Sequence, residues 1–276
     1  MNYERDLRPL QLRLRDILTE VDRVCKEQNL TYYLLAGTML GAVRHGGFIP
    51  WDDDMDIGMP RPDYDRFFEI AHKYLPEYLE LKNYTSHPNY SWWFMKVEDN
   101  RTTLIEKKDL EYKGGIYIDI FPLDAEPNNW LKRTLHMFPI NYLKRVRYFS
   151  YRDPFKHGKG ISSWPCRLAR LFYTREWVQQ QIETRLKKYD YNQTDLVCDH
   201  DGGTTSLMPK SYLGKPTPIL FEGKMFMGVE KPDAYLKCMY GDYMQLPPEE
   251  KRHFHHFNYL DLNTPYRDNP ITYKDI

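Results

Sequence analysis

Residues 35–58 read LAGTMLGAVRHGGFIPWDDDMDIG and place a glycine turn shortly before an acidic run. The apolar residues 32–35 predict a short buried strand that ends at Gly37. Residues 38–44 then predict a short helix with Thr38 as its N-cap. Residues 55–59 predict a second strand, which the chain enters through consecutive aspartates. This pattern puts a helix start and several carboxylates close together in the chain.

The acidic run is the most informative part of the sequence. Side chains alternate along an extended segment, so Asp52, Asp54 and Asp56 are expected on one face. Like charges this close require a cation or full solvation, and Mg²⁺ or Mn²⁺ suits carboxylate oxygen. A solvated acidic turn is the alternative. A calcium loop is disfavoured because its sixth position, normally glycine, is Ile57.

The helix start after Gly37 is a candidate phosphate site, because free backbone N–H groups there can bind an anion. Thr38 belongs to the same turn, and Gly41 would let a ligand or a strand approach the helix closely. An ordinary helix cap would have the same sequence. The candidate phosphate contacts from side chains are Arg44, Lys96 and His45, each of which could equally form a surface salt bridge.

A third carboxylate is expected from another strand. Asp119 interrupts the apolar segment 116–121, and an isolated buried carboxylate needs a metal, a cation or a proton. We interpret Asp119 as functional, with a structural salt bridge as the alternative. Asp124 follows a proline and reads more simply as a turn residue.

Helical and strand patterns alternate over the first 125 residues, which predicts a mixed α/β domain. Its other predicted elements are helices at 7–30 and 63–74 and strands at 79–84, 92–97 and 116–121. Beyond it we expect helices at 128–151, 164–189 and 232–240, a hairpin at 221–229, and loops at 199–203 and 215–218. The expectation is one catalytic domain, 1–276, with a core at 1–125 and a mainly helical lobe at 126–276.

Composition narrows the class of protein. The 39 Lys and Arg residues balance 39 Asp and Glu residues, so no net field favours a nucleic-acid partner. The four cysteines are far apart and show no zinc-ligand spacing, which fits a reduced setting without disulfides. The longest nearly apolar run, 34–43, is about half of a bilayer span. We therefore expect a cytoplasmic protein.

The motifs resemble those of the LicD family. Its hallmark is similar to residues 35–44 followed by 47–57, its second block to 117–124, and its terminal block to 240–243 with 246–248. Position 36 is Ala where many members have Gly or another small residue, and Ala36 is small enough to be tolerated. The resemblance implies a nucleotidyltransferase-like fold, with a mixed sheet flanked by helices.

The resemblance also implies roles and substrates. Asp54 and Asp56 match the metal-binding pair, and Asp119 matches a third acid that completes the metal shell or accepts the sugar hydroxyl proton. Family members transfer phosphocholine from CDP-choline, or ribitol phosphate from CDP-ribitol, to sugars such as those of teichoic acid or lipopolysaccharide. We therefore expect a CDP-linked donor whose diphosphate lies against Gly37 and Thr38, a sugar or lipid-linked glycan acceptor, and release of CMP.

Two other functions compete with this one. A nucleotide-sugar glycosyltransferase also uses an Asp-x-Asp metal site, although such enzymes usually build a nucleotide-binding half before that motif. A metal- or carbohydrate-binding module with a solvated acidic turn would need no catalysis. Magnesium-dependent binding of cytidine nucleotides distinguishes the three.

Three further features carry weaker hypotheses. A choline donor would need an aromatic cage, for which Trp51, Trp92 and Trp93 are candidates if they are not core residues. Residues 126–160 contain eight Lys or Arg and two Asp or Glu, which indicates peripheral contact with the inner membrane surface or a solvated basic face. The histidines at 253, 255 and 256 are candidates for metal ligation or for an acceptor contact, or form a loop.

Overall fold

The computed structural model describes residues 3–155, 160–201, 206–252 and 257–276. The strands of the main sheet are β1 (Tyr33–Leu34), β2 (Asp56–Pro60), β3 (Leu79–Lys82), β4 (Met95–Ile105), β5 (Gly114–Glu126), β6 (Leu196–Cys198), β7 (Met208–Pro209) and β10 (Tyr259–Asp261). The main path runs β1-β2-β5-β4-β10, while β3 pairs with β4, β6 with β5 and β7 with β6. The pair β2 and β5 is parallel and the other pairs are antiparallel.

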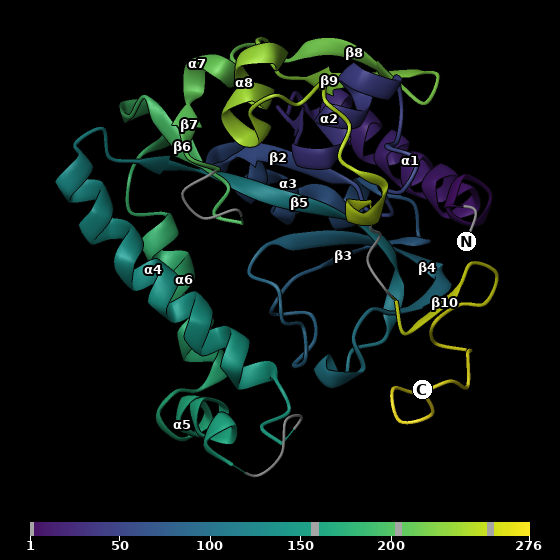
Figure 1. Cartoon of the computed structure of the whole chain (residues 1–276), viewed down its shortest axis with the longest axis vertical. Helices are drawn as coiled ribbons and strands as arrows, with labels where there is room; N and C mark the ends of the chain where they lie inside the picture. The colour runs from purple at the N-terminus through teal and green to yellow at the C-terminus, as the bar shows by residue number, and fades with distance from the viewer. Residues whose placement is uncertain (1–2, 156–159, 202–205, 253–256) are drawn as a thin grey trace.

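Helices flank this mixed sheet (Figure 1). They are α1 (Tyr3–Gln28), α2 (Ala36–His45), α3 (Arg61–Tyr74), α4 (Trp130–Tyr151), α5 (Trp164–Phe172), α6 (Arg175–Leu186), α7 (Lys210–Leu213) and α8 (Pro232–Tyr240). Helices α1 and α3 pack against β5 and against each other, and the apolar stripe of α1 is buried at Leu14, Leu18 and Val21. The α/β fold class is therefore confirmed, and the arrangement is consistent with a nucleotidyltransferase-like fold.

Two parts of the chain project from the sheet. Helix α4 packs on α5 and α6, and the three form an arm that reaches away from the strands, with α5 at its far end (Figure 1). The hairpin of β8 (Thr217–Phe221) and β9 (Lys224–Gly228) lies beside α2 and β1. Among the described residues, none of the helices combines the length and apolar character that crossing a bilayer requires.

The start of α2 differs from the prediction. The helix begins at Ala36, and its N-cap is Leu35, which forms no side-chain capping bond. Thr38 is not the N-cap: its Oγ1 accepts a hydrogen bond from the Asp56 N–H at 2.9 Å. The hydroxyl thus serves a neighbouring strand instead of its own helix.

The second half of the chain is less purely helical than its sequence indicates. It adds β6, β7 and β10 to the main sheet, and β8 begins at Thr217, inside the predicted loop 215–218. The region 164–189 forms two helices, α5 and α6, because the chain is extended at Tyr173. Strands of two or three residues are too short to show a hydrophobic period, so the sequence does not reveal them. The histidines at 253, 255 and 256, and part of the predicted loop 199–203, lie outside the described residues.

Candidate active site

Hydrogen bonds between α2 and the first residue of β2 fix the end of the acidic run. The Leu35 N–H donates to the Asp56 carbonyl at 3.0 Å, and Thr38 accepts from the Asp56 N–H. The Ala36 N–H donates to Tyr235 Oη of α8 at 2.9 Å. Because Leu35 and Thr38 both bond to Asp56, the first turn of α2 and the start of β2 are fixed side by side.

The loop before the acidic run is held from two other directions. Glu222, at the tip of the β8–β9 hairpin, accepts a hydrogen bond from the Phe48 N–H at 3.0 Å and forms an ion pair with Arg8 of α1. Gln11 of α1 donates from Nε2 to the Asp52 carbonyl at 2.9 Å. The position of the aspartates therefore depends on α1 and on the hairpin as well as on β2.

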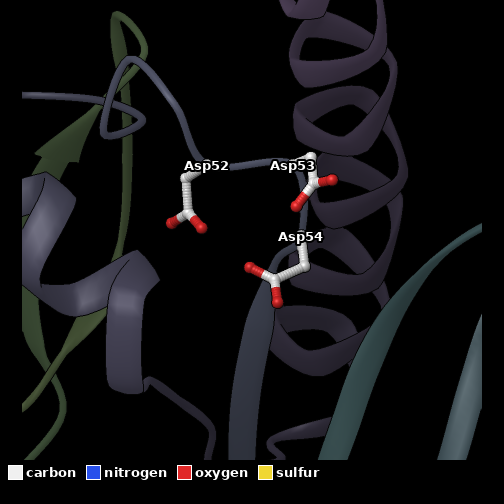
Figure 2. A group of neighbouring side chains, drawn as sticks. All are labelled: Asp52, Asp53 and Asp54. Carbon is white, nitrogen blue, oxygen red and sulfur yellow. The ribbon is translucent and has the colours of Figure 1, made fainter. Parts of the chain in front are cut away.

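Asp52, Asp53 and Asp54 point their carboxylates toward one another just before β2 (Figure 2). One oxygen from each lies within 4.8 Å of the other two. Asp53 is buried and Asp52 and Asp54 are half-buried. The prediction that Asp52, Asp54 and Asp56 share one face is not followed, because residues 52–55 precede β2 and the Asp53 carboxylate joins those of Asp52 and Asp54. A Cβ atom at Gly37 would lie 2.9 Å from Asp52 Oδ2, so the carboxylate approaches to a distance that only glycine accommodates easily.

Asp56 and Asp119 face each other across the parallel pair β2 and β5. Their residues are register partners, and the Asp119 N–H donates to the Met55 carbonyl at 2.9 Å. Burial raises the pKa of Asp56 well above its usual value, and the charges of Asp54 and Asp119 raise it further. Burial raises the pKa of Asp119 to about 7, against the opposing effect of Lys96. The carboxyl groups of Asp54, Asp56 and Asp119 thus oppose one another's ionisation.

Lys96 of β4 supplies the nearest positive charge and is completely buried. Its Nζ lies 3.2 Å from Asp119 Oδ1 and 3.9 Å from Glu106 Oε2. The same atom lies 3.9 Å from the centre of the Trp92 ring and 3.1 Å from that of Tyr117. The ammonium therefore occupies the space between two aromatic faces, where cation–π attraction offsets part of its lost hydration.

A cavity of about 290 Å³ connects these groups. Its wall includes Asp53, Asp54, Asp56 and Asp119. Trp92, Tyr117, Glu106, Asp201 and Arg147 line the same cavity. All three residues that the sequence predicts as catalytic, Asp54, Asp56 and Asp119, therefore line one cavity.

Arg147 of α4 is a cation that sequence reasoning missed. Its Nε and Nη1 atoms are buried and have no hydrogen-bond partner among the described residues. Burial lowers the pKa of its guanidinium to about 10. An adjoining cavity of about 360 Å³, lined also by Tyr148 and Arg152, shares Trp92, Lys107 and Arg147 with the acidic cavity. Arg147 therefore lines both cavities.

The donor set fits a divalent metal ion. Carboxylate oxygens are the ligands that Mg²⁺ and Mn²⁺ prefer, and a cation would relieve the repulsion that raises the pKa of Asp56. The tightest carboxylate group comprises Asp52, Asp53 and Asp54. Asp119 turns one oxygen toward Lys96 instead. Asp54 belongs to the tightest group, while Asp56 and Asp119 lie outside it.

The other predicted binding residues lie in three places. Gly37 lies next to the Asp52 carboxylate, Thr38 accepts a hydrogen bond from the Asp56 N–H, and Lys96 forms an ion pair with Asp119. Gly41 packs against the backbone of Gly47, which explains the glycine by packing. Arg44 donates to the Tyr243 carbonyl at 2.9 Å and lines a separate hollow with Trp51 and Tyr240. As far as the described residues define the acidic cavity, neither Gly41 nor Arg44 lines it.

The three tryptophans that are candidates for an aromatic cage lie in two different places. Trp92 and Trp93 line the acidic cavity, whereas Trp51 lies under Arg252, whose guanidinium carbon is 4.9 Å from the ring centre. Asp124 is not a turn residue as predicted: it is buried in β5. Both of its oxygens accept from Arg61, at 2.6 and 2.7 Å. That partner comes from α3, which the local sequence around Asp124 does not reveal.

Comparison with known proteins gives this geometry a family. The chain is 31% identical over 257 residues to the lipopolysaccharide cholinephosphotransferase LicD of Haemophilus influenzae. The alignment covers 91% of this chain and 96% of that relative. The chain belongs to the LicD family. The family model described as "LicD/FKTN/FKRP, nucleotidyltransferase domain" matches residues 29–155, a span that includes the LicD acidic strand, Asp119 and Arg147.

Two further relatives are similar to parts of this chain. An uncharacterized protein of Rickettsia prowazekii is 37% identical over 145 residues, covering 52% of this chain and 51% of that protein. The human ribitol 5-phosphate transferase FKRP is 44% identical over 46 residues, which is 17% of this chain and 9% of FKRP. Both the cholinephosphotransferase and FKRP are named for the transfer of a phosphorylated alcohol.

Proposed function

We propose that this protein is a metal-dependent phosphotransferase that moves a phosphorylated alcohol from a CDP-linked donor to a sugar and releases CMP. Phosphocholine is the first candidate for the transferred group, because the relative aligned over most of the chain is a cholinephosphotransferase. The acceptor is a sugar of a cell-surface glycan such as lipopolysaccharide, or its lipid-linked precursor.

The observation that carries the proposal is that Asp54, Asp56 and Asp119 line one cavity, which Arg147 also lines, while the buried Lys96 lies beside Asp119. Phosphoryl transfer needs little covalent participation from the protein, because positioning and charge stabilisation account for most of the catalysis. A cavity lined by carboxylates and by Arg147, with Lys96 next to Asp119, provides both.

We assign the residues as follows. Asp54 and Asp56 would hold Mg²⁺ or Mn²⁺, which when bound would offset the negative charge that builds on the phosphate and on the departing CMP. Arg147 would bind a phosphate oxygen through its unsatisfied N–H groups. Asp119 would accept the proton of the acceptor hydroxyl, with Lys96 orienting its carboxylate.

The test is a turnover assay with the purified chain, in which CDP-choline, CDP-ribitol, CDP-glycerol and UDP-sugars are compared with and without magnesium. Mass spectrometry of the products identifies the transferred group. We expect CMP and a phospho-alcohol product from one CDP-linked donor. Asp54→Asn should reduce turnover at least about 100-fold without loss of fold, because one ligand of the ion is weakened.

Controls separate this proposal from its rivals. Asp16→Asn removes a carboxylate from the exposed face of α1 and should leave turnover unchanged. Transfer of a sugar from a UDP-sugar would support a glycosyltransferase instead. Metal or glycan binding without turnover of any donor would support a binding module. Full activity of Asp54→Asn would contradict the site itself.

A further inference from the structure

Large apolar side chains gather on the outer face of α4. Leu131, Leu135, Phe138 and Tyr142 recur at intervals of four, three and four residues, and so lie on one stripe of the helix. Leu135 is 68% exposed and Phe138 is 74% exposed. The opposite side of the helix is buried at Ile140. This stripe therefore points away from the protein.

Helix α5 has its apolar face outward as well. Its buried side consists of small residues, Cys166 and Ala169. Its exposed large side chains are Trp164, Leu168, Leu171 and Phe172, with Ile161 in the preceding turn. Leu171 is 74% exposed and Phe172 is 70% exposed. An amphipathic helix that turns its large apolar side to solvent needs an apolar environment to cover it.

The two apolar faces are connected. Tyr142 Oη of the α4 stripe lies 2.9 Å from Tyr173 Oη, and Tyr173 directly follows Phe172 of α5. Tyr173 in turn stacks on Trp177 of α6, at 5.5 Å between ring centres. We call these two linked apolar faces, on α4 and α5, the arm face. It lies on the arm that projects from the sheet (Figure 1).

The segment that carries the arm face is basic in sequence. Residues 129–172 contain ten Lys or Arg and one Asp or Glu, although Arg147 and Lys144 point toward the interior of the protein. Lys132, Arg145 and Arg167 are exposed, and Arg145 continues the α4 stripe one turn beyond Tyr142. Apolar and aromatic side chains surrounded by basic residues are the composition of helices that lie in the interface of an anionic bilayer. A protein partner complementary to this face would have to be both apolar and strongly acidic.

We propose that the arm face binds the surface of an anionic membrane, with the side chains of α4 and α5 inserted among the lipid headgroups. The membrane contact itself does not depend on the proposed reaction. If that reaction is correct, docking would hold the enzyme where a lipid-linked acceptor is found, because α4 carries both the apolar stripe and Arg147 of the acidic cavity.

Vesicle flotation with the full chain tests the proposal. Vesicles of phosphatidylglycerol and phosphatidylcholine should carry the protein at low salt, and phosphatidylcholine vesicles should carry much less. The double variant Leu171→Glu with Phe172→Glu should lower the bound fraction at least about tenfold, because two inserted apolar groups become charged. The matched control is Leu220→Glu with Met225→Glu on the exposed β8–β9 hairpin, which should float like the wild type.

Two measurements make the result decisive. Circular dichroism melting establishes that both double variants are folded, and light scattering after size exclusion reports the oligomeric state. The absence of salt-sensitive flotation, or equal flotation of the α5 variant and the wild type, would overturn the proposal. So would a wild-type dimer that the α5 variant converts to a monomer, because a second copy would then cover the arm face. Flotation uses no donor, so its failure would not affect the proposed reaction.

Discussion

Ala36 is the residue whose backbone is most unusual near the site. Its φ is 44°, in the left-handed region that favours glycine, and its N–H bonds to Tyr235. Left-handed backbone costs roughly 1 kcal/mol or more for a residue with a Cβ atom. The conformation explains why glycine is compatible with this position, and why a larger side chain would be less so.

Ala36→Gly should therefore leave the free energy of unfolding unchanged or raise it by up to about 1 kcal/mol. Ala36→Val should lower it by at least about 1 kcal/mol, since a β-branched residue fits this backbone poorly. Urea unfolding monitored by circular dichroism measures both. A clear loss of stability in the glycine variant would mean that the left-handed conformation is not adopted.

Arg147 lines the cavity, and its buried Nε and Nη1 have no hydrogen-bond partner among the described residues. Arg147→Met keeps much of the volume but removes the charge, so kcat/KM for the donor should fall roughly 10- to 100-fold, equivalent to one charge-assisted hydrogen bond. Stability should not fall, because an unsatisfied buried cation is removed. Arg66→Met on the exposed surface of α3 is the control. Loss of stability with unchanged kinetics would identify Arg147 as structural.

Asp119 has one oxygen beside Lys96 and is outside the tightest carboxylate group. Asp119→Asn should lower kcat about 100-fold or more, since the proton acceptor is lost, while the stabilisation by magnesium is largely retained. Thermal melts with and without magnesium, together with single-turnover kinetics, measure the two effects. Loss of the magnesium effect would assign Asp119 to the metal instead.

At the scale of elements, β5 organises the site. It pairs with β2, β4 and β6 and carries three acids, of which Asp124 and Glu126 are buried and Asp119 is half-buried. The apolar pattern identifies its first half, but Pro122 reads as a strand end, so the second half is missed. Each of the three acids has cationic or imidazole neighbours from other elements, which no local pattern encodes.

Glu126 shows what such burial does. Its Oε1 lies 3.1 Å from His200 Nε2 and 3.7 Å from His136 Nε2, and none of these side chains is appreciably exposed. Burial raises the pKa of Glu126 from 4.5 to about 7, and it lowers the pKa of His200 to about 4. The folded state therefore favours the protonated acid and the neutral imidazole.

The sign of the pH effect follows from the direction of each shift. The folded state binds the Glu126 proton more tightly than the unfolded chain, so this residue lowers stability as pH rises from about 4.5 to 7. Glu126→Gln removes that penalty, and the difference in unfolding free energy between variant and wild type should grow by up to about 3 kcal/mol across this range. His200 is present in both proteins and contributes with the opposite sign.

Urea unfolding at a series of pH values checks this prediction. Glu69→Gln, on the exposed surface of α3, should show a difference from the wild type that changes little with pH. A constant difference for Glu126→Gln would mean that Glu126 is ionised in the folded protein throughout.

At the scale of the whole molecule, residues far apart in sequence complete the site. Local sequence patterns identify Gly37, Asp54, Asp56 and Asp119 as candidate site residues. All of them but Gly37 line the acidic cavity. Asp201 joins them from a loop after β6, and β10 closes the edge of β4. These contributions depend on how the second half of the chain returns to the first, which periodicity cannot predict.

Magnesium should stabilise the entire fold if it binds the native carboxylates and not the unfolded chain. At about 100 times its dissociation constant the gain is about 2.7 kcal/mol, which corresponds to a rise of several degrees in the melting temperature. Chelation with EDTA should reverse the gain. Asp54→Asn should lose most of the effect and Asp16→Asn should retain it, as differential scanning fluorimetry will show. Equal stabilisation of both variants would place the ion elsewhere.

The hairpin residue Glu222 has a consequence for how substrates meet this protein. Glu222 accepts a hydrogen bond from the Phe48 N–H, and Gln11 of α1 donates one to the Asp52 carbonyl. The loop that carries the aspartates is therefore held by two other elements of the fold. Under the proposed function, little of the binding free energy of the CDP-linked donor would be spent on ordering that loop. Loss of the hydrogen bond between Glu222 and Phe48 should therefore raise KM for the donor more than it lowers kcat.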